Sequence, residues 1–181
     1  MRKSVLIAVA SVSLLSACGQ PKNAVAENVT ANSAAEEPKN DLIPMSALAS
    51  KDEALKVMHE RHEGMEQIGK STKAIHRSLD SSAPDIALIQ KEAATIADLA
   101  SKTPGWFPAG TGPELGKTGA KPEIWQNQQD FSAKDGDFRK AAQAFNSAAA
   151  SGNLDAIKSS FADMGKTCKA CHDKYRSEMH H

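Results

Sequence analysis

The residues best suited to do chemistry lie close to the C-terminus, where Cys168-Lys169-Ala170-Cys171-His172 forms a CxxCH pattern. Two thiols three residues apart, followed at once by an imidazole, form the pattern that attaches c-type haem. On a helix the two cysteines lie on one face about a turn apart, so each can form a thioether with a vinyl group of the haem. His172 then follows at the position that puts its imidazole beneath the iron. The pattern predicts one covalently bound haem c with His172 as an axial ligand.

Two other kinds of site use similar residues. A redox CxxC normally follows a strand in a βαβ pattern, and no strand is predicted near Cys168. A zinc site needs further Cys or His ligands at pair spacing. The only other Cys in the sequence is Cys18, and the terminal pair His180-His181 is a poor substitute for a second ligand pair. Both alternatives are therefore less favoured than haem.

The first residues of the chain have the pattern of an export signal. Residues 1–3 are basic at two positions, and residues 4–15 form an uncharged apolar run that is too short to span a membrane. The run ends in Leu-Ser-Ala-Cys-Gly (residues 15–19), which resembles a bacterial lipobox. We therefore expect residues 1–17 to be a lipoprotein signal peptide, and Cys18 to carry the lipid.

A plain signal peptide, cut after small residues, is the alternative for this segment. The cysteine count favours lipid attachment, because two of the three cysteines go to haem and none remains to form a disulfide with Cys18. Both interpretations imply export, and c-type haem is attached on the outer side of the bacterial inner membrane. We expect a lipid-anchored protein on the periplasmic side of the envelope. Gly19 is no obvious inner-membrane retention signal, so the outer membrane is preferred.

Residues 18–45 are expected to form a flexible tether. The stretch 21–39 is rich in Ala, Asn, Glu and Pro and has few large apolar side chains, so it cannot bury enough surface to offset its ordering entropy. Removal of residues 1–17 leaves 20 of the 22 basic side chains against 22 acidic ones, a net charge of −2. No basic patch stands out, and nucleic acid is not expected as a partner.

The remaining residues, 46–181, are enough for one domain. Apolar residues recur at helical spacing in four segments: 46–79, 84–101, 121–150 and 154–178. A loop rich in Gly and Pro follows the second segment, and Trp106 and Phe107 within it are too apolar to be left in water. We therefore expect these two side chains to fold back onto the core. The fold class is predicted to be all-α, an antiparallel four-helix bundle with covalently attached haem c.

Three stretches of this bundle resemble the class II c-type cytochromes, the family of cytochrome c′ and its low-spin relatives. That family carries CxxCH near the C-terminus of a four-helix bundle. The resemblance lies in the C-terminal signature Cys168–Arg176, the helix opening Lys121–Trp125 and the first-helix motif Arg61–Gly69. It covers about residues 46–176, and the order and separation of the stretches match as well.

The resemblance places Met65 on the distal side of the iron. High-spin members carry a group there that cannot coordinate, such as Leu or Phe, and their iron is five-coordinate. Met65 is similar to the thioether ligand of the low-spin members. His/Met ligation fills both axial sites and raises the potential. We therefore expect an electron-transfer protein that cycles Fe(III)/Fe(II) between redox partners of the periplasmic or respiratory chain, with His172 and Met65 as axial ligands.

The alternative for Met65 is an ordinary core methionine that fills an irregular space. The iron would then be five-coordinate, and the protein would bind or buffer a gas such as NO or CO. An enzyme such as a peroxidase is not expected, because no acid-base pair is placed beside the open face of the iron.

Further haem contacts are expected from Arg61 and Arg176, because the Arg fork suits carboxylates such as the haem propionates. The resemblance also implies a haem contact for His62, because high-spin relatives often have a Gln at this position, near the haem edge or a propionate. His62 and Met58 lie on the same stripe as Met65 and are rival ligands. We expect His59 and His76 at the surface. Family members often pair through their first two helices, so a homodimer is possible, although the charged residues on this surface would make it polar.

Overall fold

The ends of the helices follow from local capping. Ser50, Asp85 and Asn153 each accept a hydrogen bond from the backbone N–H three residues later. A helix begins at the residue that follows each of them. Such side chains satisfy N–H groups that have no partner within the helix. Gly152 ends the third of the four long helices (Gln128–Ser151) in the left-handed conformation, with φ of 69°, which glycine adopts without steric cost.

The computed structural model describes residues 48 and 50–177. Within that part of the chain the structure has helices and no strand, and only an isolated bridge joins Ala120 to Arg176. The elements are α1 (Lys51–Leu79), α2 (Ile86–Lys102), the 3-10 turn η1 (Thr103–Gly105), α3 (Glu123–Gln126), α4 (Gln128–Ser151) and α5 (Leu154–Tyr175). The expected signal peptide, the tether and Cys18 lie outside the described residues.

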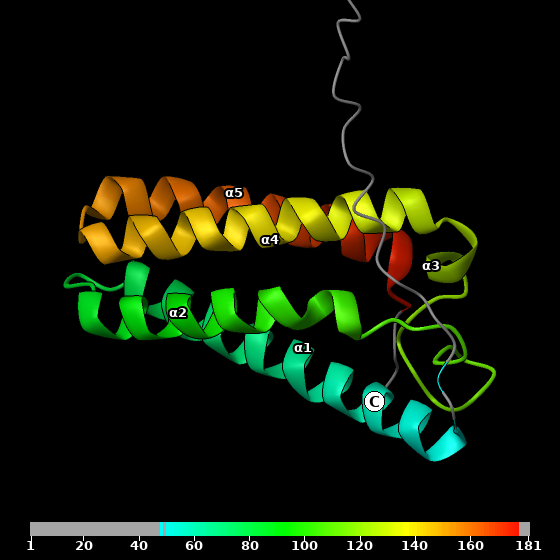
Figure 1. Cartoon of the computed structure of the whole chain (residues 1–181). Helices are drawn as coiled ribbons and strands as arrows, with labels where there is room; N and C mark the ends of the chain where they lie inside the picture. Colours follow the sequence, from blue (N-terminus) through cyan, green and yellow to red (C-terminus); the bar gives the residue numbers. More distant parts are fainter. Residues whose placement is uncertain (1–47, 49, 178–181) are drawn as a thin grey trace, which may run out of the picture. The chain divides into compact units, whose positions relative to one another are not determined.

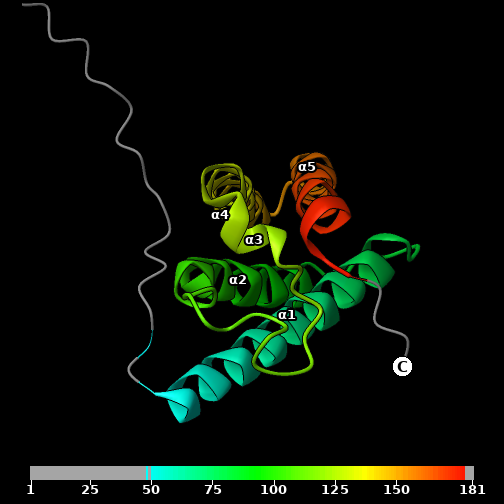
Figure 2. The same ribbon diagram turned by 90° about the vertical axis from the view of Figure 1, so that its right-hand side faces the viewer.

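The four long helices form the predicted antiparallel bundle. α4 and α5 lie side by side, α2 packs against α4, and α1 packs against α2. α1 crosses α2 obliquely, so that the Lys51 end of α1 lies farther from α4 and α5 than its Leu79 end (Figures 1 and 2). No described helix is long and apolar enough to cross a membrane.

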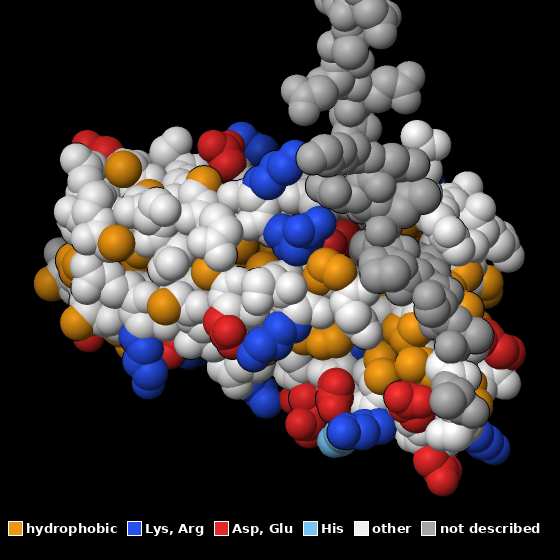
Figure 3. Space-filling model, in the orientation of Figure 1, with side chains coloured by type: hydrophobic (Ala, Val, Ile, Leu, Met, Phe, Trp, Pro, Cys, Tyr) orange, Lys and Arg blue, Asp and Glu red, His pale blue; other side chains and the backbone are white. Residues whose placement is uncertain are grey.

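One core runs through the bundle. Phe131, Phe138 and Phe145, which are seven residues apart on α4, are buried in it together with isoleucines from α1, α2 and α5. Trp106 and Phe107 are buried as well, which confirms that the Gly- and Pro-rich loop folds back. On the face drawn in Figure 3, Lys and Arg side chains are interspersed with Asp and Glu.

The helix boundaries predicted from sequence are wrong at three places. α1 starts at Lys51 and not at Ser46, because Ser50 caps it. The predicted helix 121–150 is divided at Asn127, whose φ and ψ of −124° and 52° are not helical, into α3 and α4. α5 ends at Tyr175 and not at Glu178, because Arg176 is extended. The end of α5 accompanies the bridge between Arg176 and Ala120, a contact between distant segments that apolar spacing does not reveal.

Candidate functional site

α5 carries the CxxCH motif in its last turns. Cys168 and Cys171 are both free thiols, half-buried, and packed against the core. Burial raises the pKa of both, and that of Cys171 reaches about 11, with a further contribution from the Asp135 carboxylate. The thiols therefore stay protonated at neutral pH. A disulfide does not compete for them in this structure.

His172 follows Cys171 and is exposed on the same helix. Its pKa is lowered, first by partial burial of the ring and then by the positive charge of Arg176. The backbone N–H of Arg176 also donates to the carbonyl of His172 at 3.1 Å. Arg176 thus lies next to the expected axial ligand, whereas its contact with haem stays a prediction.

These donors fit haem c. Covalent attachment needs two free thiols a turn apart beside an available imidazole, and Cys168, Cys171 and His172 supply that set. Their half-buried position means that a bound macrocycle would meet both the apolar core and the protein surface. Among the described residues, no group of three or more His, Cys, Asp or Glu side chains is placed to hold a bare metal ion.

The end of α5 is fixed from two sides, which holds His172 in place one turn earlier. The Tyr175 hydroxyl donates to Asp130 on α4, and Lys174 donates to the same carboxylate at 2.9 Å. Lys121 N–H donates to the Tyr175 carbonyl, and Ser177 N–H donates to the carbonyl of Gly119. The segment before α3 therefore acts as a short clamp on the C-terminal end of α5.

Tyr175 is buried, and its ring makes an edge contact with Phe131, with centroids 5.2 Å apart. Burial, followed by the hydrogen bond to Asp130, raises the pKa of Tyr175 to about 12. The same hydrogen bond is the main reason why the pKa of Asp130 is lowered. The sequence identified Tyr175 through the apolar stripe of the last helix and through the family signature, but gave no sign of Asp130 as its partner.

α1 carries the expected distal residue. Met65 is half-buried and packs against the same core as Cys168 and Cys171. Its coordination of iron is not tested by this geometry. Direct contact between α1 and α5 occurs farther along α1, where the rings of His76 and Phe161 meet edge to face at 6.5 Å.

The two rivals of Met65 have different surroundings. Met58 is buried, and its methyl group lies 3.9 Å from the place where a side chain at Gly116 would begin, so it packs against the loop. His62 is exposed, contrary to the expectation of a buried stripe position, because each residue turns the helix by about 100° and Arg61 takes the inward position. His59 and His76 are exposed, as expected.

Arg61 has a role that sequence reasoning missed. It is only 4% exposed, and its guanidinium donates to the Trp106 carbonyl, to the Thr111 hydroxyl and carbonyl, and to the Thr118 hydroxyl, at 2.9–3.2 Å. The prediction of a haem contact for Arg61 is not tested, but these bonds occupy both of its terminal nitrogens. A lone Arg among apolar positions was the only signal for this arrangement in the sequence.

A second charged group is buried on α4. Asp135 is 5% exposed, accepts a hydrogen bond from Arg139 Nε at 2.9 Å, and has a pKa raised by burial. The spacing of four residues between Asp135 and Arg139 suggests the pair, but only the fold shows that Asp135 is buried and near Cys171.

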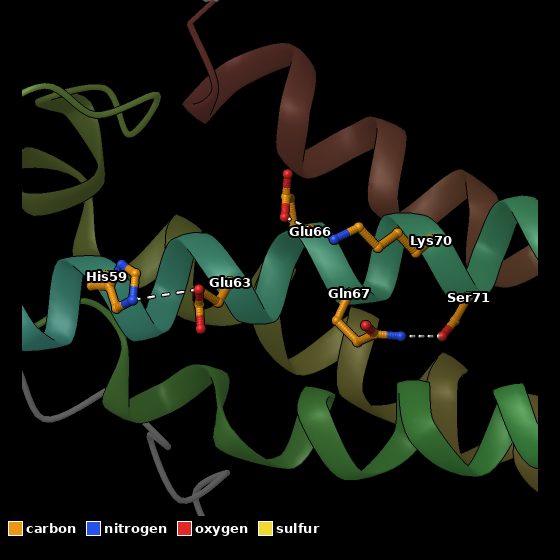
Figure 4. Close-up of polar contacts among 6 residues, drawn as sticks. All are labelled: His59, Glu63, Glu66, Gln67, Lys70 and Ser71. Atoms are coloured by element: carbon orange, nitrogen blue, oxygen red, sulfur yellow. Dashed lines mark hydrogen bonds and ion pairs between the residues drawn. The ribbon is translucent and has the colours of Figure 1, made fainter.

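The outer side of α1 is polar and separate from this site. His59 pairs with Glu63 and Lys70 pairs with Glu66 at exposed positions (Figure 4). The Gln67 amide donates to Ser71, which is buried and donates in turn to Glu92 of α2. An open groove of about 490 Å³ runs between α1, α2 and Trp106, and none of the expected haem-site residues lines it. The residues expected at the haem site lie instead on α5 and α1, where Met65, Cys168 and Cys171 pack against the same core.

Comparison with known proteins adds independent information. Residues 56–176 match the family model described as Cytochrome C'. The cytochrome c′ of Allochromatium vinosum is 34% identical over 121 residues, which are 65% of this chain and 78% of that protein.

Solved structures of cytochromes c′ are also similar to this chain. The cytochrome c′ of Thermochromatium tepidum has a TM-score of 0.64 and 33% identity, over 73% of this chain and 100% of the other. A nitric oxide complex of a cytochrome c prime variant from Alcaligenes xylosoxidans has a TM-score of 0.63 and 28% identity, over 74% of this chain and 100% of the other.

Proposed function

The chain belongs to the cytochrome c′ family, and from this premise we propose that it is a five-coordinate haem c protein that binds a small diatomic gas such as nitric oxide. Proteins of this family carry covalently bound haem c and are periplasmic. The observation that carries the proposal is the similarity to cytochromes c′ over the whole bundle, including a relative solved as a nitric oxide complex. These relatives favour the gas-binding alternative over electron transfer.

In this proposal each residue of the site has a defined task. Cys168 and Cys171 would hold the haem through thioethers, and His172 on α5 would supply an imidazole to its iron. When bound, the haem would supply an iron centre for a diatomic ligand. Met65, on the inward face of α1, would add an apolar, unbranched side chain to the lining of the site.

The supporting experiment is a ligand titration of the purified holoprotein. We expect a high-spin ferric spectrum and a stoichiometric spectral change when NO is added to the ferrous protein. A low-spin ferric protein that shows no change with NO or CO would contradict the proposal.

Electron transfer is the second candidate, and one observation favours it. Residue 65 is a methionine on the inward face of α1, and a thioether can fill the sixth position and stabilise Fe(II). An optical band from Met–Fe(III) bonding in the wild-type protein would support this candidate. Its partners would be redox proteins of the periplasmic or respiratory chain.

We propose no catalysed reaction, because relatives in this family are generally non-enzymatic carriers or binders. Relatives can also form dimers, so a homodimer of this chain is part of the proposal. We further propose that lipid on Cys18 anchors the protein to the outer membrane, which would keep the haem bundle on the periplasmic side.

A further inference from the structure

Arg61 lies four residues before Met65 on α1, one helical turn away, so the two side chains share a face of the helix. Its guanidinium makes four hydrogen bonds to the segment 106–118, two to carbonyls and two to hydroxyls. Only the planar fork of Arg can reach four acceptors in this arrangement, and the ammonium of Lys cannot. The segment 106–118 is therefore tied to α1 at the turn that precedes Met65.

The same guanidinium lies against aromatic rings. Its central carbon is 5.1 Å from the ring centre of Phe107 and 6.0 Å from that of Trp125. Trp125 in turn donates from its indole nitrogen to the carbonyls of Phe107 and Pro108. Arg61 is thus the centre of a compact unit, the Arg61 hub, made of Arg61, Phe107, Thr111, Thr118 and Trp125.

The Arg61 hub is connected to α5 through packed rings. Phe107 meets Phe131 of α4 edge to face at 4.7 Å, and Phe131 meets Tyr175 of α5 at 5.2 Å. Tyr175 is three residues beyond His172. A continuous series of contacts therefore runs from the turn before Met65 to the turn after His172.

This route matters because α1 gains little from direct packing on α5. α1 packs against α2, and its Lys51 half diverges from α4 and α5 (Figures 1 and 2). The ring contact between His76 and Phe161 lies at the other end of α1. The hydrogen bonds of Arg61 fix the segment 106–118 to α1 one turn before Met65.

We infer that Arg61 is a positioning residue, which sets the place of Met65 relative to His172 by holding the segment 106–118 against α1. The inference rests on the proposed function, because it takes Met65 and His172 to lie on opposite sides of the haem. Burial lowers the pKa of Arg61 to about 10, with Glu114 opposing the shift, so the guanidinium stays charged at neutral pH. This role differs from a contact between Arg61 and a haem propionate.

The test uses the haem-loaded full chain and four variants. Arg61→Lys keeps the charge and loses the fork, and Thr118→Val removes a hydroxyl that also accepts from Ala120 N–H. Thr118→Ser keeps the hydroxyl and is the matched control. Arg77→Lys changes an exposed Arg on the same helix. The readouts are the association rate of CO with the ferrous protein, the ferric absorption spectrum, and amide hydrogen exchange of residues 106–118.

For Arg61→Lys we expect faster hydrogen exchange of residues 106–118 and CO association about tenfold faster, since a buried hydrogen bond to a charged group is worth roughly that factor. Thr118→Val should also speed hydrogen exchange and CO association, but by a smaller factor. Thr118→Ser and Arg77→Lys should match the wild type in both measurements. If Arg61 instead contacts a haem propionate, Arg61→Lys should have CO association and hydrogen exchange close to those of the wild type, and Thr118→Val should change neither. If Arg61→Lys does not fold, Thr118→Val alone decides.

A double-variant cycle separates positioning from general stability. Met65→Ala should by itself speed CO association, and Arg61→Lys should add nothing further in that background, because Arg61 acts through Met65. Additive effects, or faster exchange with unchanged CO rates and spectra, would overturn the inference. A wild-type protein that binds neither CO nor NO would contradict the proposed function but not the role of Arg61. In that case the ferric spectra of the variants would still report the position of Met65.

Discussion

Met65 is the residue that separates gas binding from electron transfer. Replacement by Leu conserves volume and removes the sulfur lone pair, and the cost in folding free energy of such a swap is below about 1.5 kcal/mol. For the five-coordinate protein that we propose, Met65→Leu should leave the ferric spin state high-spin and change the CO association rate less than about tenfold. Absorption spectra and stopped-flow kinetics check both.

The opposite result has a clear meaning. A low-spin wild type that turns high-spin in Met65→Leu, loses the Met–Fe band and falls in potential would identify Met65 as the sixth ligand. His62→Gln is the matched control, because His62 is exposed and should not alter the spin state. A low-spin protein unaffected by either change would direct attention to Met58.

At the scale of elements, the C-terminal end of α5 depends on the bond between Tyr175 and Asp130. The pKa of Tyr175 is raised from 10.0 to about 12, first by burial and then by this hydrogen bond. The protonated, buried and bonded hydroxyl therefore stabilises the fold fully below pH 10, and this contribution is lost as the pH rises through about 12. Tyr175→Phe should lower the free energy of unfolding by about 1 kcal/mol at neutral pH. The stability of the variant should also depend less on pH between pH 10 and pH 12 than that of the wild type.

Tyr175 is the only tyrosine in the chain, so ultraviolet difference absorption follows its ionisation directly. Denaturant unfolding at pH 7 and in the alkaline range gives the stability of both proteins. A tyrosinate transition near the ordinary pKa, with equal alkaline unfolding of wild type and variant, would contradict the prediction.

The packing of α1 on the loop depends on Gly64. A Cβ at this position would collide with the ring of Trp106, which is buried, so the ring or the helix would have to shift. Gly64→Ala should therefore destabilise the protein by about 1–3 kcal/mol, although Ala favours a helix more than Gly does. The measurement is thermal or denaturant unfolding of the haem-loaded protein.

Gly136→Ala on α4 is the control for helix propensity, since a Cβ there meets only ordinary contacts. It should stabilise the protein by about 0.5–1 kcal/mol. Equal gains in stability at both positions would show that Trp106 adapts to a side chain at position 64.

At the scale of the whole molecule, we propose that lipid on Cys18 tethers the haem bundle to the membrane. Cys18→Ser should release the protein into the soluble periplasmic fraction with its haem spectrum unchanged, because Cys18 is remote in sequence from the haem motif. Cell fractionation with detection of haem on gels measures this. A wild-type chain found wholly in the soluble fraction would show that the lipobox is not used.

The sequence alone determined the fold class, the haem motif and the family. These features depend on short-range patterns, namely CxxCH spacing, the three-four alternation of apolar residues on α5, and the heptad of Phe131, Phe138 and Phe145. Each pattern needs only residues within one helix, so no knowledge of distant contacts is required.

Only the tertiary structure decided how these helices are held together. The Arg61 hub and the bond from Tyr175 to Asp130 join residues about 45–57 positions apart. The end of α5 at Arg176 also accompanies a contact between distant segments, the bridge to Ala120. The spacing of apolar residues along the chain does not reveal such partners. Buried polar groups form hydrogen bonds with whichever acceptors the folded chain brings close to them.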